Sequence, residues 1–290
     1  MNHFGKNGKT KQLKILIIGN EGYVGPHVVN QLKQNNSNIR IFGFDIGYFA
    51  HAITYNEFPE KNIDIQHRGD VRKFPKNLLK GIDSIIYLAA ISNDPMGQEF
   101  EDITFDINQK SAISIAKAAK NFGVKNFVYA SSCSVYGSLD DLPRTEKSEL
   151  NPLTAYAKSK IFTEKKLNSL ASDDFKITCL RFATACGFSP RLRLDLVLND
   201  FVASALLTKN IEILSDGSPW RPLIHVQDMA RAIDWAKDRQ GKNYLVVNAG
   251  SNEWNYQIKD LAYAVKDYFS NVNLSINENA EPDKRSYKVD

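Results

Sequence analysis

Tyr156 and Lys160 offer the clearest chemistry in this sequence, because they stand four residues apart in a segment with helical character. At that spacing both side chains lie on one face of a helix. A phenol titrates near pH ~10, and a neighbouring ammonium favours its ionised form and so lowers its pKa. Ser132, at the end of an expected strand, could hold a substrate hydroxyl toward Tyr156. These three residues predict a site that takes a proton from an alcohol and returns it.

A glycine-rich turn provides the second chemical feature. Gly19, Gly22 and Gly25 follow a short apolar run and open a helical pattern. Small residues there let the chain turn tightly, approach a pyrophosphate closely and pack the helix on the sheet. The free N–H groups and the dipole at the helix N-terminus favour the anionic pyrophosphate. Such a trio can occur by chance in a turn, but between a strand and a helix it predicts a dinucleotide site.

Asp45 ends the second expected strand, 20 residues after Gly25. A carboxylate at that position can accept hydrogen bonds from both adenosine-ribose hydroxyls. It would repel a 2′-phosphate, and the next residues, Ile46 and Gly47, supply no arginine to receive one. We therefore expect NAD rather than NADP; the alternative is that Asp45 is a solvated residue at a strand end.

The elements that must position these residues alternate in type. Short apolar runs predict strands at 13–18, 39–44, 63–67, 82–88, 127–130 and 177–181. Helical spacing predicts helices at 23–33, 104–122 and 152–170. This alternation indicates βαβ crossovers and an α/β fold with a Rossmann-type, doubly wound parallel sheet. After Gly187 the pattern loosens, with helices expected at 194–207, 227–237 and 257–268 and strands at 211–214, 222–226 and 244–248.

The domain organisation follows from this pattern. We expect a disordered tail at 1–12, an NAD-binding Rossmann domain at 13–186, and a smaller C-terminal substrate lobe made of 187–222 and 251–290. Residues 223–250 are expected to return to the Rossmann domain.

Composition limits the classes of partner. Hydrophobic residues make up 43% and charged residues 24%, as in an ordinary globular protein with a sizeable core. A net charge of +4 without a basic stripe argues against nucleic acid as a partner. Three cysteines without metal-type spacing predict a reducing compartment and no metal. We find no apolar signal segment and no apolar run long enough for a membrane, so we expect a cytoplasmic protein.

Further motifs extend along the chain: GNEGYVG (19–25), GDV (69–71), LAA (88–90), SSCSVYG (131–137), YAKSK (156–160), RPLIHVQD (221–228) and DKRSYKVD (283–290). With them the chain resembles the extended short-chain dehydrogenase/reductase superfamily, in its nucleotide-sugar epimerase/dehydratase branch. The resemblance runs from Leu13 to Asp290. It implies an N-terminal NAD domain, a smaller lobe for the nucleotide sugar and, often, a homodimer.

The resemblance also implies a set of cofactor contacts. Asp70 and Val71 would contact the adenine, residues 88–90 would line the pyrophosphate and ribose, and Asn108 would steady the long helix. Lys160 would bond the nicotinamide ribose. The expected cofactor-binding residues are Gly19, Gly22, Tyr23, Val24, Gly25, Asp45, Asp70, Val71, Leu88, Ala89, Ala90, Asn108, Tyr156 and Lys160.

Substrate contacts are implied in the same way. Asn199 and Arg221 match positions that meet the sugar nucleotide, and a planar guanidinium at Arg221 can hold diphosphate oxygens bidentately. The alternative for Arg221 is a solvated turn residue. The segment 92–97 is either a specificity loop or a polar turn. The expected substrate-binding residues are Ser92, Asn93, Ser134, Thr184, Asn199, Arg221 and Arg285.

Three departures from the family pattern matter. Where 4,6-dehydratases have Thr-Asp-Glu, this chain has Ser132, Cys133 and Ser134, so the acid and base that remove water are missing. Thr184 replaces the usual Asn after the sixth strand. Ala280 stands where an arginine is common, and Arg285 is our candidate for its work.

Three functions remain open. The leading hypothesis is an NAD-dependent epimerase similar to UDP-glucose 4-epimerases, with Tyr156 as base, Lys160 lowering its pKa and Ser132 orienting the sugar hydroxyl, at C4. The same residues could serve a nucleotide-sugar dehydrogenase or keto-sugar reductase. A non-catalytic NAD-binding scaffold is the distant alternative. Such a protein would need no proton donor, so the presence of Ser132, Tyr156 and Lys160 argues against it.

Overall fold

The computed structural model describes residues 12–137, 142–280 and 285–290. The tail expected at the N-terminus lies outside this part of the chain apart from its last residue, as do the first two residues of the DKRSYKVD motif. Within the described residues, no helix is both long and apolar enough to cross a lipid bilayer.

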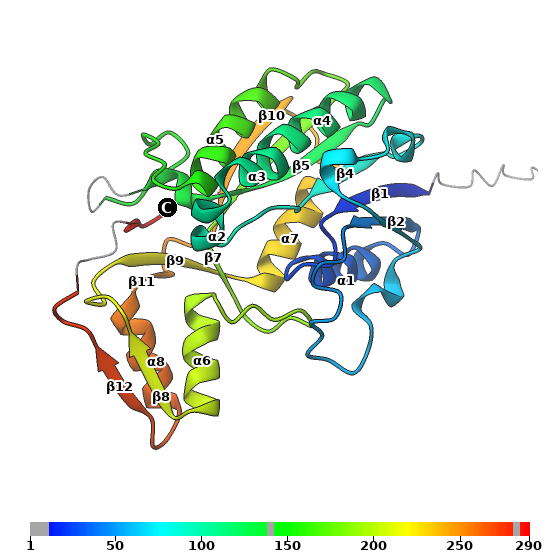
Figure 1. Cartoon of the computed structure of the whole chain (residues 1–290). Coiled ribbons are helices and arrows are strands. Elements are labelled where there is room, and N and C mark those ends of the chain that lie inside the picture. The colour runs from blue at the N-terminus through cyan, green and yellow to red at the C-terminus, as the bar shows by residue number, and fades with distance from the viewer. Residues whose placement is uncertain (1–11, 138–141, 281–284) are drawn as a thin grey trace, which may run out of the picture.

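A seven-stranded parallel sheet forms the larger part of the molecule (Figure 1). Its strands, in order across the sheet, are β10 (Tyr244–Ala249), β6 (Lys176–Phe182), β5 (Asn126–Ser132), β4 (Ser84–Tyr87), β1 (Leu13–Ile18), β2 (Ile39–Asp45) and β3 (Ile65–Arg68). From β1 the sheet grows to one side through β2 and β3 and to the other through the later strands. In open α/β sheets, ligands bind beyond the carboxyl ends of the strands at such a reversal. The prediction of a Rossmann-type, doubly wound α/β fold is confirmed.

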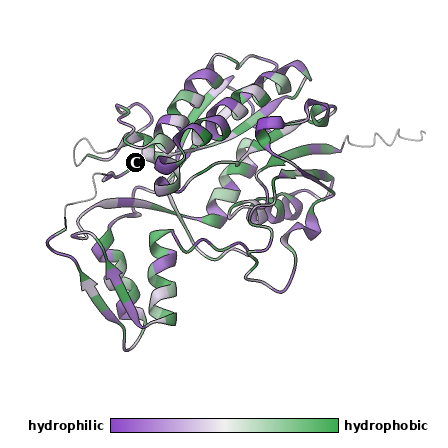
Figure 2. Ribbon diagram, in the orientation of Figure 1, coloured by the Kyte–Doolittle hydropathy of each residue, from purple (hydrophilic) through white to green (hydrophobic). Residues whose placement is uncertain are grey.

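Helices cover both faces of this sheet, which is why its strands read as continuous apolar runs. Along β1, Ile15 and Ile17 belong to one core, whereas Leu16 and Ile18 belong to the other. In Figure 2 much of the sheet is hydrophobic, while hydrophilic residues gather on the outer helices. The first face is covered by α1 (Gly25–Asn35) and α7 (Val226–Ala236), and the second by α4 (Ala112–Asn121) and α5 (Ala155–Asn168).

A smaller lobe, at the lower left of Figure 1, has a core of its own. In it, α6 (Val197–Leu207) and α8 (Ile258–Tyr268) pack on a parallel strand pair, β8 (Asn210–Ile213) and β12 (Asn273–Ile276). A three-stranded sheet lies between this lobe and the large sheet (Figure 1) and consists of β7 (Thr184–Cys186), β9 (Trp220–His225) and β11 (Asn255–Gln257).

The helix predicted at 104–122 is confirmed before β5, because the chain is helical without a gap through α3 (Glu101–Phe105), a π-helical turn η4 (Asp106–Ser111) and α4. The π-helical turn and the short helix α2 (Asp94–Glu99) that precedes α3 were not predicted. β7, β11 and β12 were not predicted, because strands of three or four residues show little periodicity. Short 3₁₀ helices occur at η1 (Pro59–Asn62), η2 (Val71–Lys73), η3 (Lys76–Leu79) and η5 (Cys133–Tyr136).

Candidate active site

The loop between β1 and α1 lets a ligand approach its backbone closely. A Cβ on Gly19, whose φ is +88°, would lie 2.4 Å from the Ala89 nitrogen, and one on Gly25 would lie 1.9 Å from the Asn20 carbonyl oxygen. Both positions therefore require glycine. At Gly22 the nearest neighbour of such a Cβ is 3.6 Å away, so the middle of the loop stays open. Because α1 begins at the end of this loop, its free N–H groups favour an anion such as a pyrophosphate.

The residues that follow β4 lie against this glycine loop. The N–H groups of Leu88 and Ala89 donate to the Ile18 carbonyl at 2.8 and 3.0 Å. Ala90 follows them and is half-buried, while Val24 is the N-cap residue of α1. These four predicted cofactor residues thus lie next to the glycine loop at the carboxyl edge of β1 and β4.

Asp45 lies at the end of β2, half-buried beside the same loop. Its carboxylate accepts hydrogen bonds from the N–H of Glu21 (3.0 Å) and the N–H of Gly47 (2.9 Å). Burial raises the pKa of Asp45, and the Gly47 hydrogen bond and the charge of Arg191 act in the opposite direction. Carboxylate oxygens can accept further bonds, so Asp45 can bind ribose hydroxyls. The glycine loop, its open centre and this carboxylate fit an NAD.

Asp70 and Val71 follow β3. The Asp70 carboxylate accepts from the Arg72 N–H (2.8 Å) and from the Arg72 Nε (2.9 Å) and so caps η2, the short helix that begins at Val71. The Arg72 hydrogen bonds hold the pKa of Asp70 below its usual value. Asp70 therefore already has a cationic partner within its own segment.

Asn108 lies in the π-helical turn η4 of the long helix. Its side chain accepts from the Ile91 N–H (2.8 Å) and donates to the Ile91 carbonyl (2.9 Å), which ties the π-helix η4 to the segment after β4. It also donates to the Ser159 hydroxyl on α5 at 3.2 Å. π-Helical turns are frequent at functional sites. Asn108 thus ties the segment after β4 to α5, the helix that carries Tyr156 and Lys160.

Ser132 and Tyr156 meet where β5 and α5 approach each other. The Ser132 hydroxyl lies close enough to that of Tyr156 to influence its pKa, and the Ser132 Oγ accepts from the Ser134 N–H at 3.1 Å. Burial raises the pKa of Tyr156 to about 12, although the Ser132 hydroxyl and the charge of Arg193 favour the phenolate. The tyrosine is thus a proton donor at neutral pH, and it needs a stronger cationic influence to act as a base.

Lys160 lies one helical turn beyond Tyr156. Its Nζ donates to the Ala130 carbonyl at 2.6 Å and lies 5.2 Å from the centre of the Tyr156 ring. Burial lowers the pKa of Lys160 to about 7, while the charge of Glu164 opposes this shift. The proposed lowering of the Tyr156 pKa by Lys160 requires the charged lysine, and an anion beside Lys160 would favour that form.

We expect Lys160 to make fold stability depend on pH. The folded-state pKa is about 7, whereas in the unfolded chain the ordinary value, near 10.4, returns. Between these values the unfolded chain binds more protons, so the free energy of unfolding rises with pH, by up to about 1.4 kcal/mol per unit. Urea unfolding from about pH 7 to about pH 9.5 should show this rise in the wild type and not in Lys160→Met. Equal slopes in the two proteins would contradict it.

Arg193 and Asp195 connect several predicted substrate residues, and sequence reasoning missed both. The Arg193 guanidinium donates to the Ser92 hydroxyl (2.8 Å) and bidentately to Asp195 (3.0 and 2.7 Å). Asp195 also accepts from the Asn93 side chain at 2.9 Å, and the Asn199 side chain donates to the Arg193 carbonyl at 3.0 Å. In the sequence, Arg193 is one charge in a loop, and no local signal places it beside Tyr156.

Tyr23 joins the glycine loop to the segment that precedes α6. Its hydroxyl donates to the Gly187 carbonyl at 2.6 Å and accepts from the Asn199 side-chain amide at 3.4 Å. Burial raises the pKa of Tyr23 to about 12. Tyr23 therefore links the glycine loop to the lobe helix α6, which carries Asn199.

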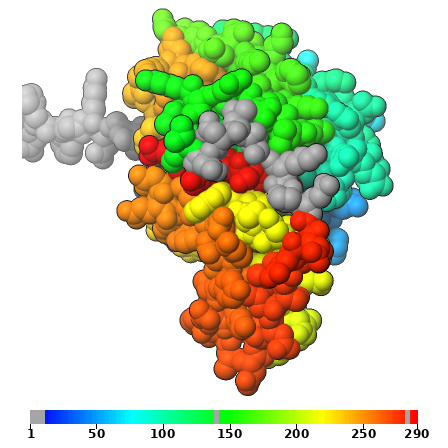
Figure 3. Space-filling view, turned by 90° about the vertical axis from the view of Figure 1, so that its left-hand side faces the viewer, coloured from blue at the N-terminus to red at the C-terminus, as the bar shows by residue number. Residues whose placement is uncertain are grey.

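Arg221 on β9 and Arg285 near the C-terminus lie next to each other. Arg221 donates to the Trp220 carbonyl (2.9 Å) and to the Arg285 carbonyl, and Arg285 forms an ion pair with Asp94 on α2. Figure 3 shows the C-terminal residues, in red, between the upper part of the molecule and the lobe below. Arg221 is thus anchored rather than a solvated turn residue.

Two further predicted substrate residues are Thr184 and Ser134. Thr184 lies half-buried in β7 and pairs with Leu223 of β9. The Ser134 hydroxyl is buried and has no hydrogen-bond partner among the described residues, which leaves it able to bind a ligand group.

A dinucleotide-binding sheet with Ser, Tyr and Lys at its carboxyl edge defines an enzyme of the extended short-chain dehydrogenase/reductase type. The model of the NAD dependent epimerase/dehydratase family matches residues 15–250. The chain belongs to this family, and its cofactor is NAD.

Individual relatives carry epimerase and dehydratase names. An uncharacterized UDP-glucose epimerase of Bacillus subtilis (strain 168) is 28% identical over 254 residues, which are 83% of this chain and 78% of that protein. A UDP-N-acetylglucosamine 4-epimerase from Methanobrevibacter ruminantium M1 has a TM-score of 0.84 at 21% identity, covering 97% of this chain and 90% of that one. The NDP-hexosamine 5,6-dehydratase TunA has a TM-score of 0.83 at 22% identity, covering 96% and 88%. The fold is therefore shared by both kinds of enzyme.

Proposed function

We propose that this protein is a nucleotide-sugar epimerase that transiently oxidises a sugar hydroxyl, at C4, to a ketone. The observation that carries the proposal is the placement of Ser132 at the end of β5 next to Tyr156 on α5, with Lys160 buried one turn away, beside a loop that fits NAD. The names of relatives, UDP-glucose epimerase and UDP-N-acetylglucosamine 4-epimerase, support a nucleotide sugar as substrate.

Each residue has a distinct role in this proposal. Ser132 orients the sugar hydroxyl, and Tyr156 takes its proton and later returns it. Lys160, in its charged form, favours the phenolate. NAD, when bound, supplies a hydride acceptor and then a donor, so the reaction has no net redox change. The anchored Arg221 is the candidate for the diphosphate, because a guanidinium matches two phosphate oxygens.

The residues at 132–134 argue against a 4,6-dehydratase, because Cys133 and Ser134 stand where an acid and a base would be needed. Burial also raises the pKa of the Cys133 thiol, so it is a poor proton donor. A dehydrogenase or keto-sugar reductase would use the same Ser132, Tyr156 and Lys160, and only the product distinguishes it from an epimerase.

The test is an NMR product assay of purified protein with UDP-, dTDP-, GDP- and CDP-sugars and no added cofactor. An epimerase with retained NAD converts one of these sugars to its C4 epimer. Activity that requires added NAD or NADH and gives net oxidation or reduction would establish the dehydrogenase or reductase instead.

We also propose that the protein is a cytoplasmic homodimer in which 13–186 and 223–250 form the NAD domain and the remaining C-terminal residues form the substrate lobe. The three cysteines are free and buried, as a reducing compartment allows. β10 joins the large sheet beside β6, which supports the return of the chain to that domain. Light scattering on the purified protein tests the dimer.

A further inference from the structure

The structure brings an arginine to the Asp45 turn, although the residues that follow Asp45 supply none. Asp45 on β2 and Arg68 on β3 are partners in a parallel ladder, so their side chains project from the same face of the sheet. A Cβ added to Gly47 would lie 2.4 Å from the Arg68 Nη1, so the guanidinium lies against the turn. The Arg68 side chain is 52% exposed. A cation in this place is what a 2′-phosphate on the adenosine ribose would need.

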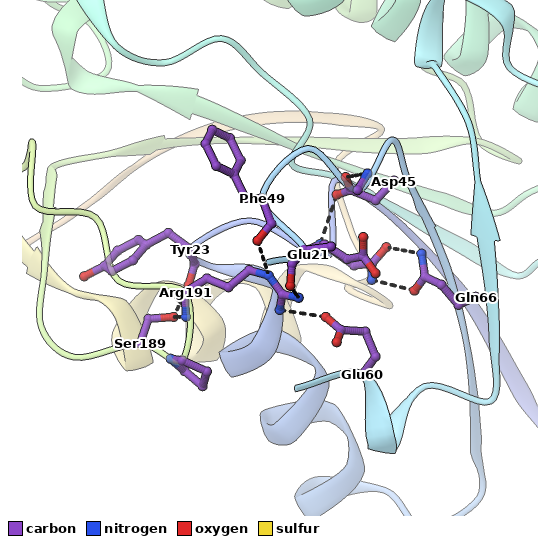
Figure 4. Close-up of polar contacts among 12 residues, drawn as sticks. Glu21, Tyr23, Asp45, Phe49, Glu60, Gln66, Ser189 and Arg191 are labelled. Atoms are coloured by element: carbon purple, nitrogen blue, oxygen red, sulfur yellow. Dashed lines mark hydrogen bonds and ion pairs between the residues drawn. The ribbon is translucent and has the colours of Figure 1, made fainter. Parts of the chain in front are cut away.

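Glu21 already binds this arginine. It stands inside the glycine loop, where its N–H donates to Asp45 at 3.0 Å, and its fully buried carboxylate forms an ion pair with Arg68. Figure 4 shows Glu21 beside Asp45 at the end of the strands. The Glu21 Oε1 is buried without a hydrogen-bond partner among the described residues, so the burial of this acid depends on Arg68.

A second cation near Asp45 is not accessible to a phosphate. The charge of Arg191 acts on Asp45, but the Arg191 side chain is only 3% exposed. It donates to the carbonyls of Phe49 (3.2 Å) and Ala50 (3.3 Å) and pairs with Glu60 at 2.7 Å, as Figure 4 illustrates. Arg191 therefore secures the loop after β2, and Arg68 is the cation that a ligand at the turn can reach.

We propose that Glu21 is a cofactor-specificity residue, which keeps Arg68 from binding a 2′-phosphate and so, together with Asp45, selects NAD over NADP. The ion pair with Arg68 also neutralises Glu21, which would otherwise repel the pyrophosphate held by the same loop. The inference concerns the cofactor site alone, so it stands or falls independently of the proposed epimerase activity.

The test compares two fragments that differ only by the 2′-phosphate, 5′-AMP and 2′,5′-ADP. Their affinities for the full-length wild type and Glu21→Gln are measured by calorimetry, and the nucleotide that copurifies with each protein is identified after extraction. In Glu21→Gln, the affinity for 2′,5′-ADP relative to 5′-AMP should rise about tenfold or more, because Arg68 becomes available for a charge-assisted hydrogen bond. Adding Arg68→Met to Glu21→Gln should abolish the gain.

Glu57→Gln is the matched control. Glu57 is exposed in the loop after β2 and pairs with Lys61, so the same change of charge there should leave the affinity ratio unchanged. An unchanged ratio of the two affinities in Glu21→Gln would overturn the proposal, even if both affinities rose. If Glu21→Gln does not fold, Glu21→Asp, which retracts the carboxylate by one methylene, should show a smaller shift in the same direction. No shift in Glu21→Asp would then overturn it.

Discussion

Tyr156→Phe is expected to lower turnover by about 10²- to 10⁴-fold, the usual contribution of a positioned acid–base group, and to leave NAD binding intact. The expectation rests on the closeness of the Ser132 and Tyr156 hydroxyls, because Ser132 is the residue proposed to hold the sugar hydroxyl. The substitution removes one oxygen from a half-buried ring and leaves the packing of that ring unchanged. Turnover is measured under saturating sugar nucleotide, and NAD content is measured on the same protein.

A second phenol serves as the control for this substitution. Tyr87 is buried in β4, and its hydroxyl donates to the Ile107 carbonyl at 2.8 Å. Tyr87→Phe removes a buried hydroxyl without touching the Ser132 pair, so its turnover should change by only a few-fold. Loss of turnover with NAD retained in Tyr156→Phe excludes the scaffold hypothesis. Undiminished turnover would instead remove Tyr156 from the role of base.

The charge states of Tyr156 and Lys160 limit the role that Lys160 can have. Burial places the pKa of Tyr156 near 12 and that of Lys160 near 7, so the two groups do not form an ion pair over most of the neutral range. The role assigned to Lys160 from the sequence rests on a charge that its buried position disfavours. Sequence spacing established that both side chains share a face, but it contained no information on their desolvation.

The parts of the site that the sequence predicted are those in which local residues suffice. Gly19 and Gly22 lie in the loop between β1 and α1, Gly25 begins α1, and Asp45 ends β2; each position follows from a short pattern. Tyr156 lies near the start of a helix that Thr154 caps through the Ala157 N–H. Periodicity and turn chemistry were enough in these cases.

The parts that escaped prediction depend on strand register and on contacts between distant segments. Arg68 reaches the Asp45 turn because β3 pairs with β2 in one particular register, which no local pattern reveals. Arg193 reaches Ser92 across about one hundred residues of sequence. The parallel pair of β8 and β12 likewise joins segments that lie far apart in the chain. Asn108 binds the backbone of Ile91, a contact between segments that helical periodicity does not reveal.

The C-terminal residues show the same limitation. Tyr287 and Val289 are buried against Cys133, Val135 and Ile161 and so form a core cluster beneath the segment that carries Ser132. In the sequence these residues belong to a polar stretch without periodicity. Their burial became apparent only from the way the chain returns to β5 and α5.

Glu164→Ala should be the most destabilising single substitution near the site, at about 3–5 kcal/mol. Glu164 on α5 binds Arg181 on β6 bidentately, at 3.0 and 2.7 Å, and both side chains are 5% exposed. It also accepts from the Ser131 hydroxyl at 2.5 Å. Removing the carboxylate would leave a buried guanidinium whose remaining side-chain partner, among the residues the structure describes, is the Tyr136 hydroxyl. Urea unfolding measures the loss.

Glu57→Ala is the comparison, because its exposed pair with Lys61 should contribute less than about 1 kcal/mol. A cost for Glu164→Ala as small as that of Glu57→Ala would contradict the importance of the buried pair.

Glu164→Gln tests the effect of the Glu164 charge on activity, which a measurement of stability does not cover. The charge of Glu164 favours the ammonium of Lys160, so its neutralisation should lower the pKa of Lys160 further. If a charged Lys160 assists Tyr156, Glu164→Gln should lose activity at neutral pH even under conditions in which it is fully folded.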